Sequence, residues 1–156
     1  MTEPDRRSHG LRVAQVIATG SFAGTERYAT NLAAGLARRG IESLLVGADA
    51  KSARAALDRL GASVHYVPAH NCYSAFRQLR DLRPLDLVHC HLTPAEFAGT
   101  AAFPSRKGTV VVATRHIAAR RGSTPLSRMG CTWVRARLDS QMAISHFVAS
   151  RVDGPS

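Results

Sequence analysis

Short apolar runs alternate with amphipathic stretches along most of the chain. The runs have the length of strands, and the longer stretches carry apolar residues at helical spacing on one side. Such alternation predicts an open, Rossmann-like, doubly wound α/β fold with a mostly parallel sheet. The expected strands are 11–18, 42–46, 63–67, 86–91, 109–114 and 141–144, and the expected helices are 25–39, 51–60, 73–82, 94–102, 125–138 and 146–152.

The first strand, loop and helix carry the clearest local signals. Residues 11–18 are almost wholly apolar, as expected of a strand buried on both faces of a parallel sheet. In the helix that follows, Thr25 is the expected N-cap, and Glu26 lies favourably near the positive end. Gly40 is the expected stop.

Composition bounds the class of protein. A chain of 156 residues with 45% hydrophobic and 21% charged residues suits one domain with a real core and is not disordered. The apolar runs are far shorter than the roughly 20 residues of a membrane span, and the charged opening residues are unlike a secretory signal. Three cysteines without regular spacing favour reduced thiols, so we expect a cytoplasmic location.

The chain is strongly basic, with a formal charge of +10. Residues 106–156 hold nine basic and two acidic side chains, which favours an anionic partner, although solvated surface charge is the simpler explanation. Arg77, Arg80 and Arg83 beside Phe76 are candidates for a peripheral contact with the inner membrane face. Aromatic residues make up only 6% and do not interleave with basic ones, so no nucleic-acid partner is expected.

Two glycines flank the loop after the first strand. Gly20 and Gly24 precede an expected helix N-terminus, where backbone N–H groups and the helix dipole favour an anion. Their spacing matches neither the dinucleotide-binding fingerprint nor a P-loop. The loop is therefore either a phosphate site or a plain strand-to-helix turn.

Histidines mark the ends of two later strands. His89 and His91 are two apart on one expected strand, so they point to one face while Cys90, expected in the core, points to the other. Together with His116, one strand along, they form a possible three-ligand metal set. The alternative, which we adopt, is no metal, with one histidine packed in the sheet and His91 near the cleft mouth.

Several segments in order resemble the N-terminal, acceptor-side domain of retaining GT-B glycosyltransferases of family 4. The resemblance rests on the loop and helix AGTERY of residues 23–28, the run DLVHCH of 86–91, the run VVVATRH of 110–116 and the AIS of 143–145. Members usually carry a Gly-Gly pair in the loop, whereas here Ala23 stands at the first position of that pair.

The resemblance implies roles for particular residues. Gly20, Gly24 and Thr25 would lie against the diphosphate of a nucleotide-sugar donor. His116 would face the reaction centre as the catalytic residue, donating a hydrogen bond to the acceptor or to the departing phosphate. Acceptor-binding candidates, suited to a phosphate-bearing or lipid-linked acceptor, are His91, Arg115, Arg120 and Arg121.

The resemblance also sets the expected domain plan. Residues 1–10 form a polar lead-in, 11–152 the family 4-like domain, and 153–156 the truncated start of a crossover to a donor-binding domain that is absent. We therefore expect no turnover from this chain without a donor-binding domain in cis or in trans, and no cofactor beyond the nucleotide-sugar co-substrate. The alternative is a non-catalytic, basic Rossmann-like module that binds an anionic ligand or nucleic acid.

Overall fold

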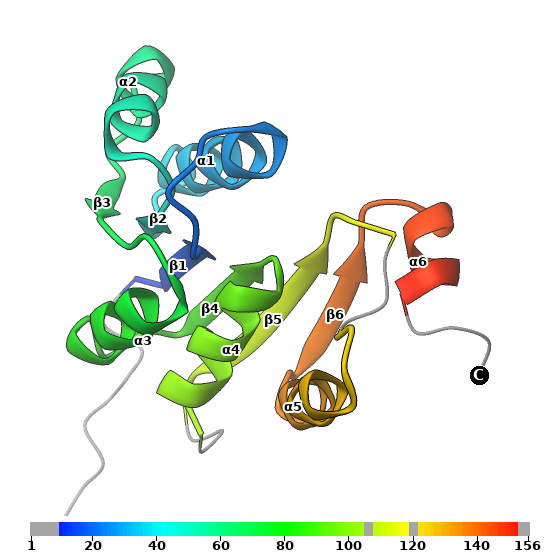
Figure 1. Cartoon of the computed structure of the whole chain (residues 1–156). Helices are drawn as coiled ribbons and strands as arrows, with labels where there is room; N and C mark the ends of the chain where they lie inside the picture. The colour runs from blue at the N-terminus through cyan, green and yellow to red at the C-terminus, as the bar shows by residue number, and fades with distance from the viewer. Residues whose placement is uncertain (1–9, 105–107, 119–121, 153–156) are drawn as a thin grey trace, which may run out of the picture.

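A computed structural model describes residues 10–104, 108–118 and 122–152. They form one six-stranded parallel sheet in the order β3-β2-β1-β4-β5-β6, with a helix following each strand (Figure 1). The strands are β1 (Arg12–Ile17), β2 (Glu42–Gly47), β3 (His65–Val67), β4 (Leu87–His91), β5 (Val110–Arg115) and β6 (Ser140–Ala143). The helices are α1 (Gly24–Ala37), α2 (Ala50–Leu60), α3 (Cys72–Asp81), α4 (Thr93–Ala102), α5 (Pro125–Arg135) and α6 (His146–Val152).

Helices cover both faces of the sheet, as the doubly wound expectation requires. Alternate residues of each strand point to opposite faces, so Val16 belongs to one buried cluster and Ile17 to the other. The cluster of Val16 includes residues of α3, α4 and α5, and the cluster of Ile17 includes residues of α1 and α2. The predicted fold class and element order are thus confirmed.

The predicted boundaries needed small corrections. Helix α1 begins at Gly24 with Ala23 as its N-cap, so the prediction of Thr25 as N-cap was wrong. The carboxylate of Glu26 folds back onto the backbone N–H of Ala23, and the helix starts two residues earlier than a Thr25 cap would place it. β3 starts only at His65, and α5 ends at Arg135. Cys90 is fully buried in the core, as predicted.

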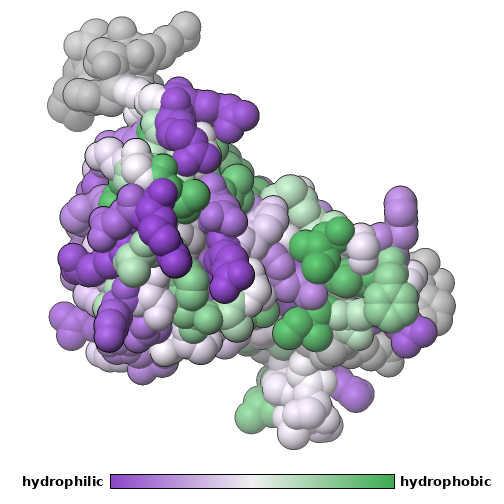
Figure 2. Space-filling view, turned by 90° about the horizontal axis from the view of Figure 1, so that it is seen from above, coloured by the Kyte–Doolittle hydropathy of each residue, from purple (hydrophilic) through white to green (hydrophobic). Residues whose placement is uncertain are grey.

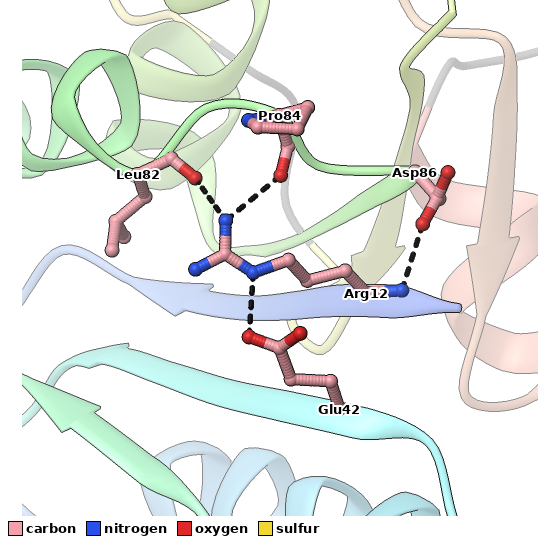
Figure 3. Close-up of polar contacts among 5 residues, drawn as sticks. All are labelled: Arg12, Glu42, Leu82, Pro84 and Asp86. Atoms are coloured by element: carbon pink, nitrogen blue, oxygen red, sulfur yellow. Dashed lines mark hydrogen bonds and ion pairs between the residues drawn. The ribbon is translucent and has the colours of Figure 1, made fainter. Parts of the chain in front are cut away.

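Arg12 ties together three segments at the amino-terminal edge of the sheet (Figure 3). Its Nε donates to Oε1 of Glu42 on β2 at 2.6 Å, and Nη1 donates to the carbonyl oxygens of Leu82 and Pro84. Its backbone N–H donates to Oδ2 of Asp86 at 2.8 Å. Arg12 therefore has a structural role at this edge, and the opposite, carboxyl edge is the one at which doubly wound sheets bind ligands.

Candidate functional site

The site expected of this fold lies where the strand order reverses, between β1 and β4. These two strands are paired in parallel with Ile17 opposite His91, so the loop after β1 and the end of β4 lie side by side. β5 is the next neighbour, with Thr114 opposite His91, which brings the residue after β5 to the same edge. In doubly wound sheets, ligands bind at this position.

Glu26 organises the loop after β1. Its Oε1 accepts from the hydroxyls of Thr19 at 2.7 Å and Ser21 at 2.9 Å, and its Oε2 accepts from the backbone N–H of Ala23 at 2.9 Å. Only 3% of the residue is exposed. Burial raises the pKa of this carboxyl, but the hydrogen bonds from Thr19, Ala23 and Ser21 outweigh it and leave the pKa below its ordinary value. Glu26 is therefore ionised at neutral pH and acts as the internal brace of the loop.

The start of α1 beyond this brace has free space and donors. Ala23 has no side-chain oxygen, so the N-cap residue offers nothing to the first helical N–H groups, those of Gly24 and Thr25. A Cβ placed on Gly24 would find no atom within 4 Å. The structure thus puts Gly24 and Thr25 together at an open helix N-terminus, the arrangement that favours an anion. Gly20 lies across from His70, since a Cβ placed on Gly20 would be 3.9 Å from Nδ1 of that histidine.

Histidines predicted from β4 and β5 do come together. Nδ1 of His91 lies 3.1 Å from Nε2 of His116, and Nε2 of His91 lies 2.9 Å from Oε1 of Gln15 on β1. Nε2 of His89 pairs instead with Oγ1 of Thr114 at 2.7 Å. His91 is fully buried, whereas His116 is half-buried. His91, expected near the cleft mouth, is therefore buried, and the rings of His116 and Tyr28 lie against it.

The histidines are held neutral by their surroundings. Burial, together with the neighbouring His116, lowers the pKa of His89 to about 4. Burial and the adjacent histidines lower the pKa of His91 to about 2. Burial also lowers the pKa of His116, with Arg115 adding to the effect and Glu26 opposing it. All three rings are uncharged at neutral pH.

Tyr28 of α1 forms a wall of the site. Its ring meets the rings of His91 and His116 edge-on, with centroids 5.7 and 5.1 Å apart. The residue is 43% exposed, so Tyr28 lies between the histidines and solvent. This contact connects the helix that begins at the anion-favouring loop with the histidine cluster.

Arg115 lies apart from the histidine cluster. It points to the opposite face of the sheet, where Nη1 donates to Oε1 of Glu96 at 3.0 Å and to Oγ1 of Thr93 at 3.2 Å. Only 7% of the residue is exposed. Arg115 therefore helps fix α4 to β5 in this structure. Arg120 and Arg121, the other predicted basic acceptor contacts, lie outside the described residues.

Two further expectations concern metals and membranes. Among the residues that the structure describes, no group of three or more His, Cys, Asp or Glu is arranged to hold a metal ion. No helix in the described ranges is both long enough and apolar enough to span a bilayer. Arg80 and Arg83 lie over the rings of Phe76 and Phe103, and Phe76 packs partly against the core.

Sequence reasoning missed the residues that support the site. Gln15 was read only as part of an apolar strand, although one amide in an otherwise apolar buried run is itself a signal of a buried polar partner. For Glu26, the sequence indicates only a favourable charge near the helix N-terminus and does not reveal the hydrogen bonds by which it braces the loop. Tyr28 recurs with Leu32 and Leu36 at four-residue spacing, so by pattern alone it belongs to the apolar stripe of α1. Their partners lie on other elements, so local patterns did not reveal them.

Comparison with known families identifies a family for most of the chain. The sequence model of the family described as Glycosyltransferase Family 4 matches residues 22–154, from the loop before α1 to beyond α6. The search of curated proteins and the search of solved structures each found no significant match. The matched segment includes Gly24, Glu26, His91 and His116, so it covers both halves of the candidate site.

Proposed function

This chain belongs to Glycosyltransferase Family 4, and from that premise we propose that it forms the acceptor-side half of a sugar-transfer site. The reaction moves a sugar from a nucleotide-diphosphate donor to an acceptor hydroxyl, with retention of configuration. In this proposal Gly20, Gly24 and Thr25 lie along the donor diphosphate, and His116 contacts the reacting groups.

The observation that carries the proposal is the meeting of two features at one edge of the sheet. An open helix N-terminus stands at the start of α1, and a neutral, half-buried histidine follows β5. Tyr28 of α1 touches the His116 ring, so the two features belong to one site. Negative charge builds on the leaving diphosphate during transfer, and helix N–H groups are useful where that charge develops.

We propose that turnover needs a donor-binding domain, in cis or in trans. In support, exposed apolar side chains lie beside the carboxyl ends of β5 and β6, and Figure 2 shows hydrophobic surface at that end of the molecule. Exposed apolar patches of this kind mark surfaces that a partner covers. The residues concerned are Ile117, Met142, Ile144 and Phe147. The purified 156-residue chain should then show no sugar transfer by itself.

The remaining acceptor contacts belong to the same proposal. Arg120 and Arg121 are assigned to a phosphate on the acceptor because guanidinium groups bind phosphate in a fork geometry. Arg115 would support them from the ion pair with Glu96. His91 would act on the acceptor only by way of His116.

Binding of nucleoside diphosphates tests the proposal, since it needs no knowledge of the sugar. UDP, GDP and ADP would be titrated by calorimetry into the chain and into the variant Gly24→Leu. The Cβ of the leucine has open space around it, and the rest of the side chain would cover the first helical N–H groups, so the affinity should fall at least tenfold. Gly35→Leu, on the same helix, is the matched control and should bind as the original chain does.

The outcome also separates the proposal from its alternative. Equal binding by the Gly24→Leu variant would remove the role of this loop. Salt-sensitive binding of any polyanion, with no preference for a nucleoside diphosphate, would instead favour a non-catalytic basic module.

A further inference from the structure

A buried chain of three polar side chains runs from the core to the candidate site. It begins at Gln15 on β1, which is 1% exposed, passes through the fully buried His91 on β4 and ends at the half-buried His116 after β5. We infer that Gln15, acting through His91, fixes the ring tautomer of His116 so that the unprotonated Nδ1 of His116 faces the site. Gln15 is then a positioning residue for the proposed reaction.

The hydrogen bonds determine where each proton lies. The Oε1 of Gln15 is a carbonyl oxygen and only accepts, so Nε2 of His91 carries the proton in their 2.9 Å contact. A neutral imidazole has one N–H, which leaves Nδ1 of His91 as an acceptor. The 3.1 Å contact to His116 then requires the proton on Nε2 of His116. Nδ1 of His116 is left with a lone pair, and within the described part of the chain it makes no hydrogen bond.

This assignment requires neutral rings, and the surroundings provide them. Burial lowers the pKa of His91 to about 2, and it lowers that of His116 from its ordinary value. The titratable groups around His116 are His91, His89, Tyr28 and Glu26, and Arg115, whose side chain lies on the opposite face of the sheet, acts on His116 through its charge. Among the charges, Arg115 opposes protonation and Glu26 favours it, with burial the larger effect.

The tautomer narrows what His116 can recognise. The sequence interpretation had His116 donating a hydrogen bond to the acceptor or to the departing phosphate. A neutral ring whose only N–H is directed at His91 has no proton to give to a phosphate oxygen. Its Nδ1 lone pair matches a group that donates, such as an acceptor hydroxyl. This consequence rests on the proposed function, whereas the tautomer itself does not.

Ring-nitrogen NMR of the ligand-free chain, labelled at histidine, tests the tautomer directly. The spectra would be recorded at about pH 8, above the ordinary histidine pKa of about 6.5. Protonated and unprotonated ring nitrogens give separate signals, so the position of each proton is observed. His91 and His116 should both carry the proton on Nε2. A proton on Nδ1 of either ring would overturn the inference.

Two variants of Gln15 show whether that residue sets the tautomer. Gln15→Glu, with its carboxyl ionised at about pH 8, keeps an acceptor at the same position, so both rings should keep the proton on Nε2. Gln15→Leu removes the acceptor, so His91 and His116 should become mixtures of tautomers. His89, which is bonded to Thr114, is the internal control and should not change. Unchanged tautomers in a folded Gln15→Leu chain would overturn the role of Gln15. If that variant does not fold, the spectrum of the unmodified chain still decides which tautomer is present.

Pyrophosphate separates this inference from the proposed function. Added to the unmodified chain, it should shift the backbone amide signals of Gly24 and Thr25 and leave the proton of His116 on Nε2. Unmoved amides would count against the diphosphate site and leave the tautomer result standing. Transfer of the His116 proton to Nδ1 on binding would instead show that His116 donates to phosphate, and would overturn the hydroxyl assignment.

Discussion

Replacing Glu26 by glutamine should destabilise the fold far more than the same change at an exposed glutamate. The Glu26 carboxylate accepts three hydrogen bonds of 2.7 to 2.9 Å while almost wholly buried. A glutamine of the same size keeps one oxygen, but its NH₂ group would face the N–H of Ala23 or the hydroxyls, which leaves a buried donor unsatisfied. Loss of one charge-assisted bond and weakening of the others should cost about 3 kcal/mol of unfolding free energy.

The matched control is Glu42→Gln. Glu42 makes one 2.6 Å ion pair with Arg12, and its side chain is 56% exposed. Exposed ion pairs of this kind contribute little, so the control should lose less than about 1 kcal/mol. Urea unfolding followed by circular dichroism would give the free energy of unfolding for both variants and the unmodified chain.

The pH dependence provides a second, independent check. The pKa of Glu26 in the folded chain lies below its ordinary value of 4.5, so its stabilising effect is present above that pH and is lost as the pH falls through the folded pKa. The gap between the unmodified chain and Glu26→Gln should therefore narrow below about pH 4.5. The role of Glu26 as a brace would be refuted by either of two results. The first is a loss of unfolding free energy in Glu26→Gln no larger than that in Glu42→Gln, and the second is a difference between Glu26→Gln and the unmodified chain that stays constant on acidification.

Three further predictions concern stability. Gly47→Ala should lower the free energy of unfolding in urea by at least about 3 kcal/mol, because the backbone has φ +103° and the new Cβ would lie 1.7 Å from a carbonyl oxygen of β1. Gly61→Ala, where the space is open, is the control, and an equal loss in the two variants would contradict the prediction. His89 and His91 have lowered pKa values in the folded chain, so the unfolded chain binds more protons as the pH falls. Each histidine should therefore lower the free energy of unfolding in urea by about 2 kcal/mol as the pH falls from about 7 to about 5. A free energy of unfolding without this pH dependence would show that both rings charge normally. Arg12→Met should lower the free energy of unfolding by about 2 kcal/mol, which is more than the loss in Glu42→Gln, because two carbonyl oxygens also lose their donor. Equal losses in the two variants would show that the ion pair alone matters.

The element order followed from the sequence because its signals are local. The apolar run at 11–18 and the four-residue spacing of Tyr28, Leu32 and Leu36 depend only on which side chains a strand or helix buries. The parallel sheet then follows from strands alternating with helices. Placement of Gly24 and His116 at one edge follows too, because parallel strands bring their carboxyl ends together.

Residue roles required the tertiary structure, because they depend on partners far away in the chain. Arg115 and His116 are adjacent in sequence but lie on opposite faces of the sheet, so one pairs with Glu96 and the other with His91. His91 is near the strand end, yet its contacts with Gln15 and His116 bury it completely. Their positions in the sequence place these residues at the carboxyl edge of the sheet, whereas the strand order decides which of their side chains meet there.

The sequence by itself therefore determined the fold class and the edge of the sheet at which the candidate site lies. Periodicity is a property of neighbouring residues, and burial of an apolar stripe leaves few alternative architectures. The brace at Glu26 and the chain from Gln15 to His116 were decided only by the tertiary structure. Their hydrogen bonds join β1, β4 and the residue after β5, and the direction of each bond depends on atoms that no local pattern places together.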